Sequence, residues 1–93
     1  MKEYYVEISG KALEDMNSIF LYIANQLQAP QTAQNQYDRI AGGIQSLRYF
    51  PERCKTVDCK WSPTLRRLLV NNYCVFYYIE KDCVKVVRVL YSS

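Results

Sequence analysis

The chain has 93 residues, no histidine and a formal net charge of +3. This length builds one small domain, and we expect residues 1–93 to form it without a second lobe that would leave room for a nucleotide cofactor. The basic excess is too small to indicate nucleic-acid binding by itself, so the placement of the cations has to carry that argument. The lack of histidine removes the usual general acid or base and any Ser-His-Asp or Cys-His nucleophile.

Neither a membrane span nor a metal motif is visible. No segment approaches the roughly 18 apolar residues of a membrane helix, and the first residues resemble a strand rather than a leader. We therefore expect a cytoplasmic protein with no membrane association. The four cysteines then favour reduced thiols, and their spacing, with Cys54 and Cys59 five positions apart, matches no zinc motif. We predict no metal and no cofactor.

The first half of the chain predicts a strand followed by two helices. Alternation of Tyr4, Val6 and Ile8 is typical of a strand with one buried face, and Ser9 is a suitable helix N-cap. Apolar residues then recur at helical spacing and predict an amphipathic helix of about five turns: Leu13, Met16, Phe20, Ile23 and Leu27.

A second helix follows almost at once. Pro30 suits its first turn, and the apolar stripe repeats at Ala33, Tyr37, Ile40, Ile44 and Leu47. So short a link requires the two helices to pack antiparallel. Gly42 and Gly43 fall inside this helix, where they indicate a close approach by another backbone, or alternatively a hinge or antitoxin contact. We expect Pro51 to end the helix, because the residue before a proline is pushed out of the α region.

The last third predicts a three-stranded antiparallel meander. Two runs of β-branched and aromatic residues flank Asn71-Asn72, Glu80 to Asp82 supplies the next turn, and the run 83–91 follows. The fold class is therefore α+β: an N-terminal strand, a helix hairpin and the meander. Both faces of the middle strand are apolar; we assign the Val75, Tyr77 and Ile79 face to the core.

Cations gather in the segment before the meander and within it. We predict a target or phosphate-binding surface, because arginine and lysine on a sheet suit a phosphate or carboxylate partner; its residues are Lys55, Lys60, Arg66, Arg67 and Arg88. Two alternatives remain at this point. Arg67 is equally suited to be a solvated edge charge, and Arg88 to pair with a carboxylate such as Glu7 or Glu14.

The element order and several local patterns resemble the RelE/ParE superfamily, the toxic halves of bacterial type II toxin-antitoxin modules. The resemblance covers nearly the whole chain and is nearer to the ParE branch. The residues that carry it are the segment 12–23, Ala33, the segment Leu47-Arg48-Tyr49-Phe50-Pro51-Glu52, and the strand segments 67–73, 75–77 and 87–91.

The resemblance implies one of two activities. RelE-like members are ribosome-dependent endonucleases that cut mRNA with Lys, Arg and Tyr side chains, whereas ParE-like members inhibit DNA gyrase. In the RelE branch an arginine usually follows the tyrosine that opens the middle strand; here Cys74 follows Tyr73, and a thiol cannot replace a guanidinium. The arginine that the family commonly carries beyond the last strand is also missing before Ser93, so that the sequence is either clipped there or lacks this cation.

The resemblance therefore implies a ParE-like toxin that is not itself a hydrolase, with a cognate antitoxin and DNA gyrase as partners. The alternative is a RelE-like endonuclease that acts on the ribosome and mRNA, with a candidate catalytic set that contains cations but no obvious base: Arg67, Lys60, Arg88, Tyr78 and Tyr91. A third possibility is a degenerate module that only binds antitoxin. We expect the antitoxin to cover the exposed apolar side of the meander, at Trp61, Leu69, Phe76 and Tyr78.

Overall fold

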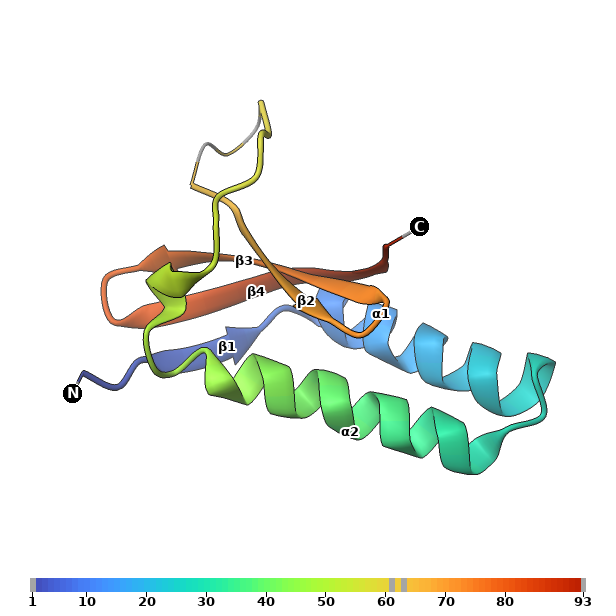
Figure 1. Ribbon diagram of the computed structural model, residues 1–93. Helices are drawn as coiled ribbons and strands as arrows, with labels where there is room; N and C mark the ends of the chain where they lie inside the picture. The colour runs from blue at the N-terminus through green and yellow to red at the C-terminus, as the bar shows by residue number, and fades with distance from the viewer. Residues whose placement is uncertain (1, 61, 63, 93) are drawn as a thin grey trace.

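The structure, a computed structural model, describes residues 2–60, 62 and 64–92. Two helices lie side by side as one layer against one face of a sheet (Figure 1). This arrangement confirms the predicted α+β fold. In chain order the elements are β1 (Tyr5–Ile8), α1 (Gly10–Leu21), the π-helical segment η1 (Tyr22–Gln26), α2 (Pro30–Ser46), the 3₁₀ turn η2 (Pro51–Arg53), β2 (Arg66–Val70), β3 (Tyr73–Glu80) and β4 (Cys83–Tyr91).

The sheet is mixed, with strand order β1-β4-β3-β2. Strands β2, β3 and β4 form the predicted antiparallel meander, while β1 pairs with β4 in parallel. Both connections of the meander are two-residue turns that place a residue in the left-handed region, Asn71 at φ 53° and Lys81 at φ 57°. Such turns match the twist of the flanking strands.

The helices begin where the sequence predicts. Ser9 accepts a hydrogen bond from the backbone N–H of Ala12 at 3.0 Å, which is the N-cap interaction, and Pro30 opens α2. Helix α2 ends at Ser46, several residues before the proline that we expected to end it. Neither helix in the described ranges is long and apolar enough to cross a bilayer.

The core confirms the face assignment of the middle strand and corrects part of the first helical stripe. Val75 and Tyr77 are fully buried against the helices. On α1, however, Leu13 is 48% exposed, and Leu27 beyond η1 is 56% exposed. The first helix meets the sheet through Ala12 and Met16, one turn apart, so Leu13 is rotated toward solvent. The wider π-helical turn, in which the Leu27 N–H bonds to the Tyr22 carbonyl, changes the direction of the side chains that follow.

Gly43 has a packing role that Gly42 lacks. A Cβ placed on Gly43 would lie 2.7 Å from Cγ2 of Val70 and 3.5 Å from Cδ2 of Leu68, whereas no atom lies within 4 Å of a Cβ placed on Gly42. The close approach is therefore real, but a side chain of β2 makes it rather than a backbone. Val70 is branched at Cβ and has little freedom to turn away.

We predict opposite effects for alanine at these two glycines. Gly43→Ala should destabilise the fold by about 1 to 3 kcal/mol, because overpacking forces α2 away from β2. Gly42→Ala should leave stability unchanged or raise it by up to about 1 kcal/mol, because alanine favours a helix more than glycine does. Urea denaturation of both variants measures the difference. Equal midpoints would show that the Gly43 contact is not tight.

Candidate functional site

The face of the sheet that points away from the helices, here called the outer face, carries cations and aromatic rings together. The strand register places Arg67, Phe76 and Arg88 in one row across β2, β3 and β4. The next row toward the Asn71 turn consists of Leu69, Cys74 and Leu90, and the next row in the other direction pairs Tyr78 with Lys85. Leu69 is 61% exposed, and Phe76 and Tyr78 are half-buried.

A basic hollow of about 470 Å³ lies at the β2 edge of this face. Its lining comes from the segment before β2 and from β2 itself: Lys55, Thr56, Val57, Asp58, Arg67 and Leu69. Arg67 and Lys55 are exposed. Within the described part of the chain, no carboxylate oxygen lies at ion-pair distance from the Arg67 guanidinium. The hollow therefore presents a guanidinium and an ammonium group to solvent, with one carboxylate in its lining.

Backbone pairing fixes the wall of the hollow. The Arg67 N–H donates to the Lys55 carbonyl at 3.3 Å, and the Val57 N–H donates to the Leu65 carbonyl at 2.8 Å. The residues 55–57 thus continue the sheet for a short distance beyond β2. Because backbone hydrogen bonds hold both sides, the two cations are positioned by the sheet rather than by a free loop.

Arg66 has a different role from its neighbour Arg67. Its guanidinium donates to the backbone carbonyls of Glu52 and Cys54, so it fastens the connection between α2 and β2. The Tyr77 hydroxyl donates to the Pro51 carbonyl at 2.6 Å on the same connection. Burial raises the pKa of Tyr77, and the neighbouring Cys54 thiol adds to this, so the phenol stays protonated and remains a donor.

Arg88 is paired with a carboxylate, as one alternative proposed, but the partner is Asp15 and not Glu7 or Glu14. Nε and Nη2 of Arg88 donate to the two Asp15 oxygens at 2.7 and 3.1 Å, and the Val89 backbone N–H donates to Oδ2 at 3.0 Å. Glu7 instead pairs with Lys85 across the parallel strands. Burial would raise the pKa of Asp15, but the hydrogen bonds from Arg88 and Val89 outweigh it and lower the pKa below 3.8.

A bulge in β4 creates this geometry. Phe76 lies opposite Arg88, while the next residue, Tyr77, lies opposite Val86, so Val87 is an extra residue in β4. The extra residue shifts the alternation and lets Val86 and Val89 both face the core, where each is 1% exposed. Arg88 consequently points to the outer face and reaches α1 around the edge of the sheet.

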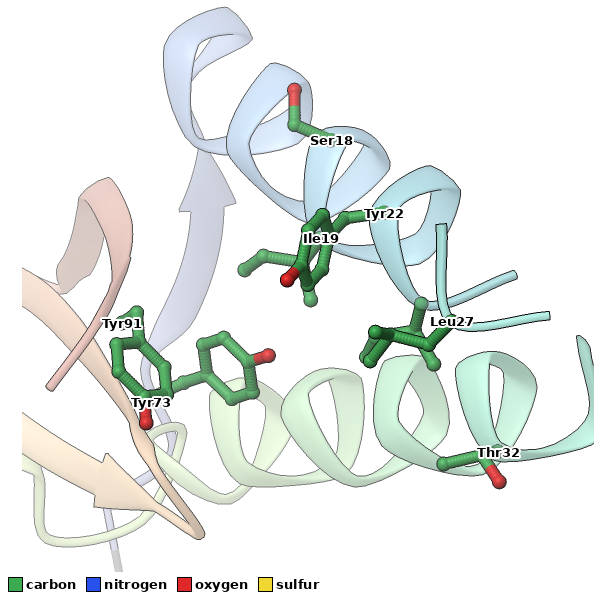
Figure 2. Close-up of a pocket in the computed structure, with 8 residues that line it drawn as sticks. Ser18, Ile19, Tyr22, Leu27, Thr32, Tyr73 and Tyr91 are labelled. Atoms are coloured by element: carbon green, nitrogen blue, oxygen red, sulfur yellow. The ribbon is translucent and has the colours of Figure 1, made fainter. Parts of the chain in front are cut away.

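A second concave feature lies on the opposite side of the sheet, between the helix hairpin and the ends of β3 and β4. None of the described residues that line this apolar groove of about 660 Å³ is charged. Figure 2 shows Ile19 and Tyr22 from the first helical segment on one side of it and Tyr73 and Tyr91 from the strands on another. The rings of Tyr73 and Tyr91 meet edge to face, 5.6 Å between centroids. The lining residues are Ser18, Ile19, Tyr22, Ile23, Leu27, Thr32, Tyr73 and Tyr91.

The structure divides the candidate endonuclease set between the two sides of the sheet. Arg67, Arg88 and Tyr78 share the outer face, whereas Tyr91 lines the apolar groove. Lys60 is exposed in the segment before β2. Trp61, which we predicted to contact an antitoxin, lies outside the described residues. The sequence analysis did not identify Asp15 as the partner of Arg88, and it did not identify the apolar groove. The signal for the groove was the pair of tyrosines, Tyr73 and Tyr91, at the two ends of the predicted hairpin.

Comparison with known proteins decides the family. Residues 6–93 match the family model described as the ParE toxin of the type II toxin-antitoxin system parDE. The chain belongs to this ParE toxin family. No curated protein sequence matches it.

Several solved structures share this fold at low sequence identity. The chromosomal ParDE system from P. aeruginosa contains a chain that is 14% identical, with a TM-score of 0.84 and complete coverage of both chains. The RelBE2 toxin-antitoxin complex from Mycobacterium tuberculosis gives 17% identity and a TM-score of 0.69 over 98% of this chain and 93% of that one. YafQ from E. coli gives 13% identity and a TM-score of 0.57 over 96% and 93%. At such identities the likeness concerns the fold alone.

We predict that Asp15→Asn lowers stability at neutral pH by about 1 to 3 kcal/mol, the range for hydrogen bonds to a charged group that is largely withdrawn from water. Folding lowers the pKa of Asp15 below its ordinary value of 3.8. The Asp15 carboxylate therefore stabilises the fold fully above pH 3.8, and this stabilisation is lost as the pH falls through the lower pKa of the folded state. The difference between wild type and variant should therefore shrink in acid. Thermal unfolding from pH 7 to pH 2 measures it.

Glu7→Gln is the matched control for this prediction. Its pair with Lys85 also lowers the pKa of the carboxylate, but the Glu7 side chain is 61% exposed, so its removal should cost less. An Asp15→Asn variant no less stable than Glu7→Gln at pH 7 would contradict the assigned role of Asp15.

Proposed function

We propose that this ParE-family chain is a growth-arresting toxin that inhibits DNA gyrase in the cytoplasm, is neutralised by a cognate antitoxin and does not hydrolyse a substrate itself. Membership of the ParE family is the observation that carries the proposal. In this proposal such a module stabilises the plasmid or chromosomal segment that encodes it, because cells that lose the antitoxin are arrested.

The outer face supports a binding role better than a catalytic one. An RNA-cutting site requires a base for the 2′-hydroxyl and several cations around one phosphate. Here Arg88 is committed to Asp15, Arg66 to backbone carbonyls, and Tyr91 to the other side of the sheet. Arg67 and Lys55 remain as exposed cations beside the hollow. Two cations in a hollow suit an acidic surface of a protein partner.

The antitoxin, in this proposal, covers the apolar part of the outer face. Leu69 is 61% exposed and lies beside half-buried Phe76 and Tyr78, an area that would favour association with another chain. An antitoxin there would also contact Arg67 and so block access to the hollow.

The direct test is a gyrase supercoiling assay with the purified toxin. We expect the wild type to inhibit supercoiling and Arg67→Gln to need at least about tenfold more protein for the same effect. Lys81→Gln, which removes an exposed cation from the β3–β4 turn, is the charge-matched control and should inhibit like the wild type.

Unchanged supercoiling at saturating wild-type toxin would overturn the gyrase assignment. Cleavage of mRNA on programmed ribosomes, abolished by Arg67→Gln, would support the endonuclease alternative in its place. Expression without growth arrest would indicate a module that only binds antitoxin.

A further inference from the structure

Phe50 occupies a backbone conformation that its side chain disfavours. Its φ of 49° and ψ of 54° lie in the left-handed region, which glycine adopts freely and which crowds any Cβ. The following residue is Pro51, which restricts the preceding backbone further. The other non-glycine residues with positive φ in the described ranges, Gln28, Asn71 and Lys81, are all polar. Phe50 is the apolar exception.

Burial does not explain the phenylalanine. Its side chain is 60% exposed, whereas the aromatic residue of the core, Tyr77, is fully buried. Tyr49 beside it is 37% exposed, and the Arg48 guanidinium lies 5.3 Å from the Tyr49 ring centroid. Arginine and tyrosine are characteristic of the residues that dominate binding energy at protein interfaces. A solvent-exposed ring at a position suited to glycine therefore indicates a role outside the folded monomer.

The surrounding connection holds Phe50 firmly in place. Arg53 donates to the carbonyls of Tyr49 at 2.7 Å and Phe50 at 3.1 Å and to the Ser46 hydroxyl at 2.8 Å. On the other side, the Pro51 carbonyl accepts the hydrogen bond from buried Tyr77. Because the backbone at Phe50 is held before binding, presenting the ring to a pocket costs little backbone entropy, which favours its use as an anchor.

We propose that Phe50 is an anchor that inserts into an apolar pocket on the toxin's target protein, with Arg48 facing a carboxylate at the rim of that pocket. The inference rests on the proposed function and extends its target-binding surface. Phe50 and Lys55 belong to the same connection between α2 and β2, residues 47–65. Arg48, Lys55 and Arg67 place cations at this end of the molecule, where the carboxylates of Glu3 and Glu52 accept hydrogen bonds from tyrosine hydroxyls. The apolar groove lies at the other end of α2, a helix of 17 residues.

The test compares Phe50→Gly with the wild type in four measurements. Thermal unfolding should show an equal or higher midpoint, because glycine relieves the backbone strain. Antitoxin affinity should be unchanged. Gyrase inhibition and growth arrest should weaken about tenfold or more, as expected for the loss of an interface anchor. Phe50→Tyr, which keeps the ring, should retain activity, and Leu13→Ala, which removes another exposed apolar side chain, should have no effect.

Three results would overturn the proposal. The first is full activity of Phe50→Gly. The second is a lowered midpoint of thermal unfolding, which would mean that Phe50 stabilises the fold. The third is a parallel loss of antitoxin affinity, which would mean that the ring binds the antitoxin. Failure of the proposed function is separate, because wild-type toxin would then leave supercoiling unchanged. If the wild type still arrests growth, comparing its growth arrest with that of Phe50→Gly would test the anchor against the target that the toxin then acts on.

Discussion

The contact of Asp15 with Arg88 and the Val89 backbone is the interaction on which the arrangement of helices and sheet depends. Strand β1 covers only the first part of β4, since its last pair is Ile8 with Val86. Beyond that point β4 would present unpaired backbone groups, which are costly to bury and prone to aggregation when exposed. The chain solves this with side chains: Ser9 donates to the Val87 carbonyl, and Asp15 accepts from the Val89 N–H. A helix thus completes the edge that a strand leaves open.

The same contact removes Arg88 from the cations that are free to bind a partner. The sequence predicted five cations on this surface, Lys55, Lys60, Arg66, Arg67 and Arg88, but two of the arginines have partners within the chain. Arg88 pairs with Asp15 of α1, and Arg66 donates to backbone carbonyls in the connection between α2 and β2. Arg67 and Lys55 remain beside an open hollow. Guanidinium groups that satisfy internal carboxylates or carbonyls have fewer donors left for a partner. The binding surface is therefore narrower than the distribution of basic residues in the sequence suggests.

Periodicity made most of the fold predictable, because the helix stripes, the Ser9 cap and the Asn71 turn are local signals. The assignment of Val75 and Tyr77 to the core was correct although both faces of β3 are apolar. Contacts between residues far apart in the sequence decided the features that periodicity does not predict. The exposure of Leu13 follows from the α1 contact at a sheet edge. Asp15 sits 73 residues before Arg88 in the chain, and the bulge at Val87 that turns Arg88 outward leaves no mark in the sequence pattern.

Amide hydrogen exchange at Val89 tests the role of Asp15 most directly. If α1 completes the edge of β4, the Val89 N–H is held by a carboxylate that is itself largely buried, and it should exchange only through unfolding of much of the domain. Its opening free energy should then approach that of core amides such as Val75, and fall in Asp15→Asn. Exchange of the Val89 amide as fast as that of the Lys81 turn would contradict the account, because α1 would then not be fastened to the sheet at this point.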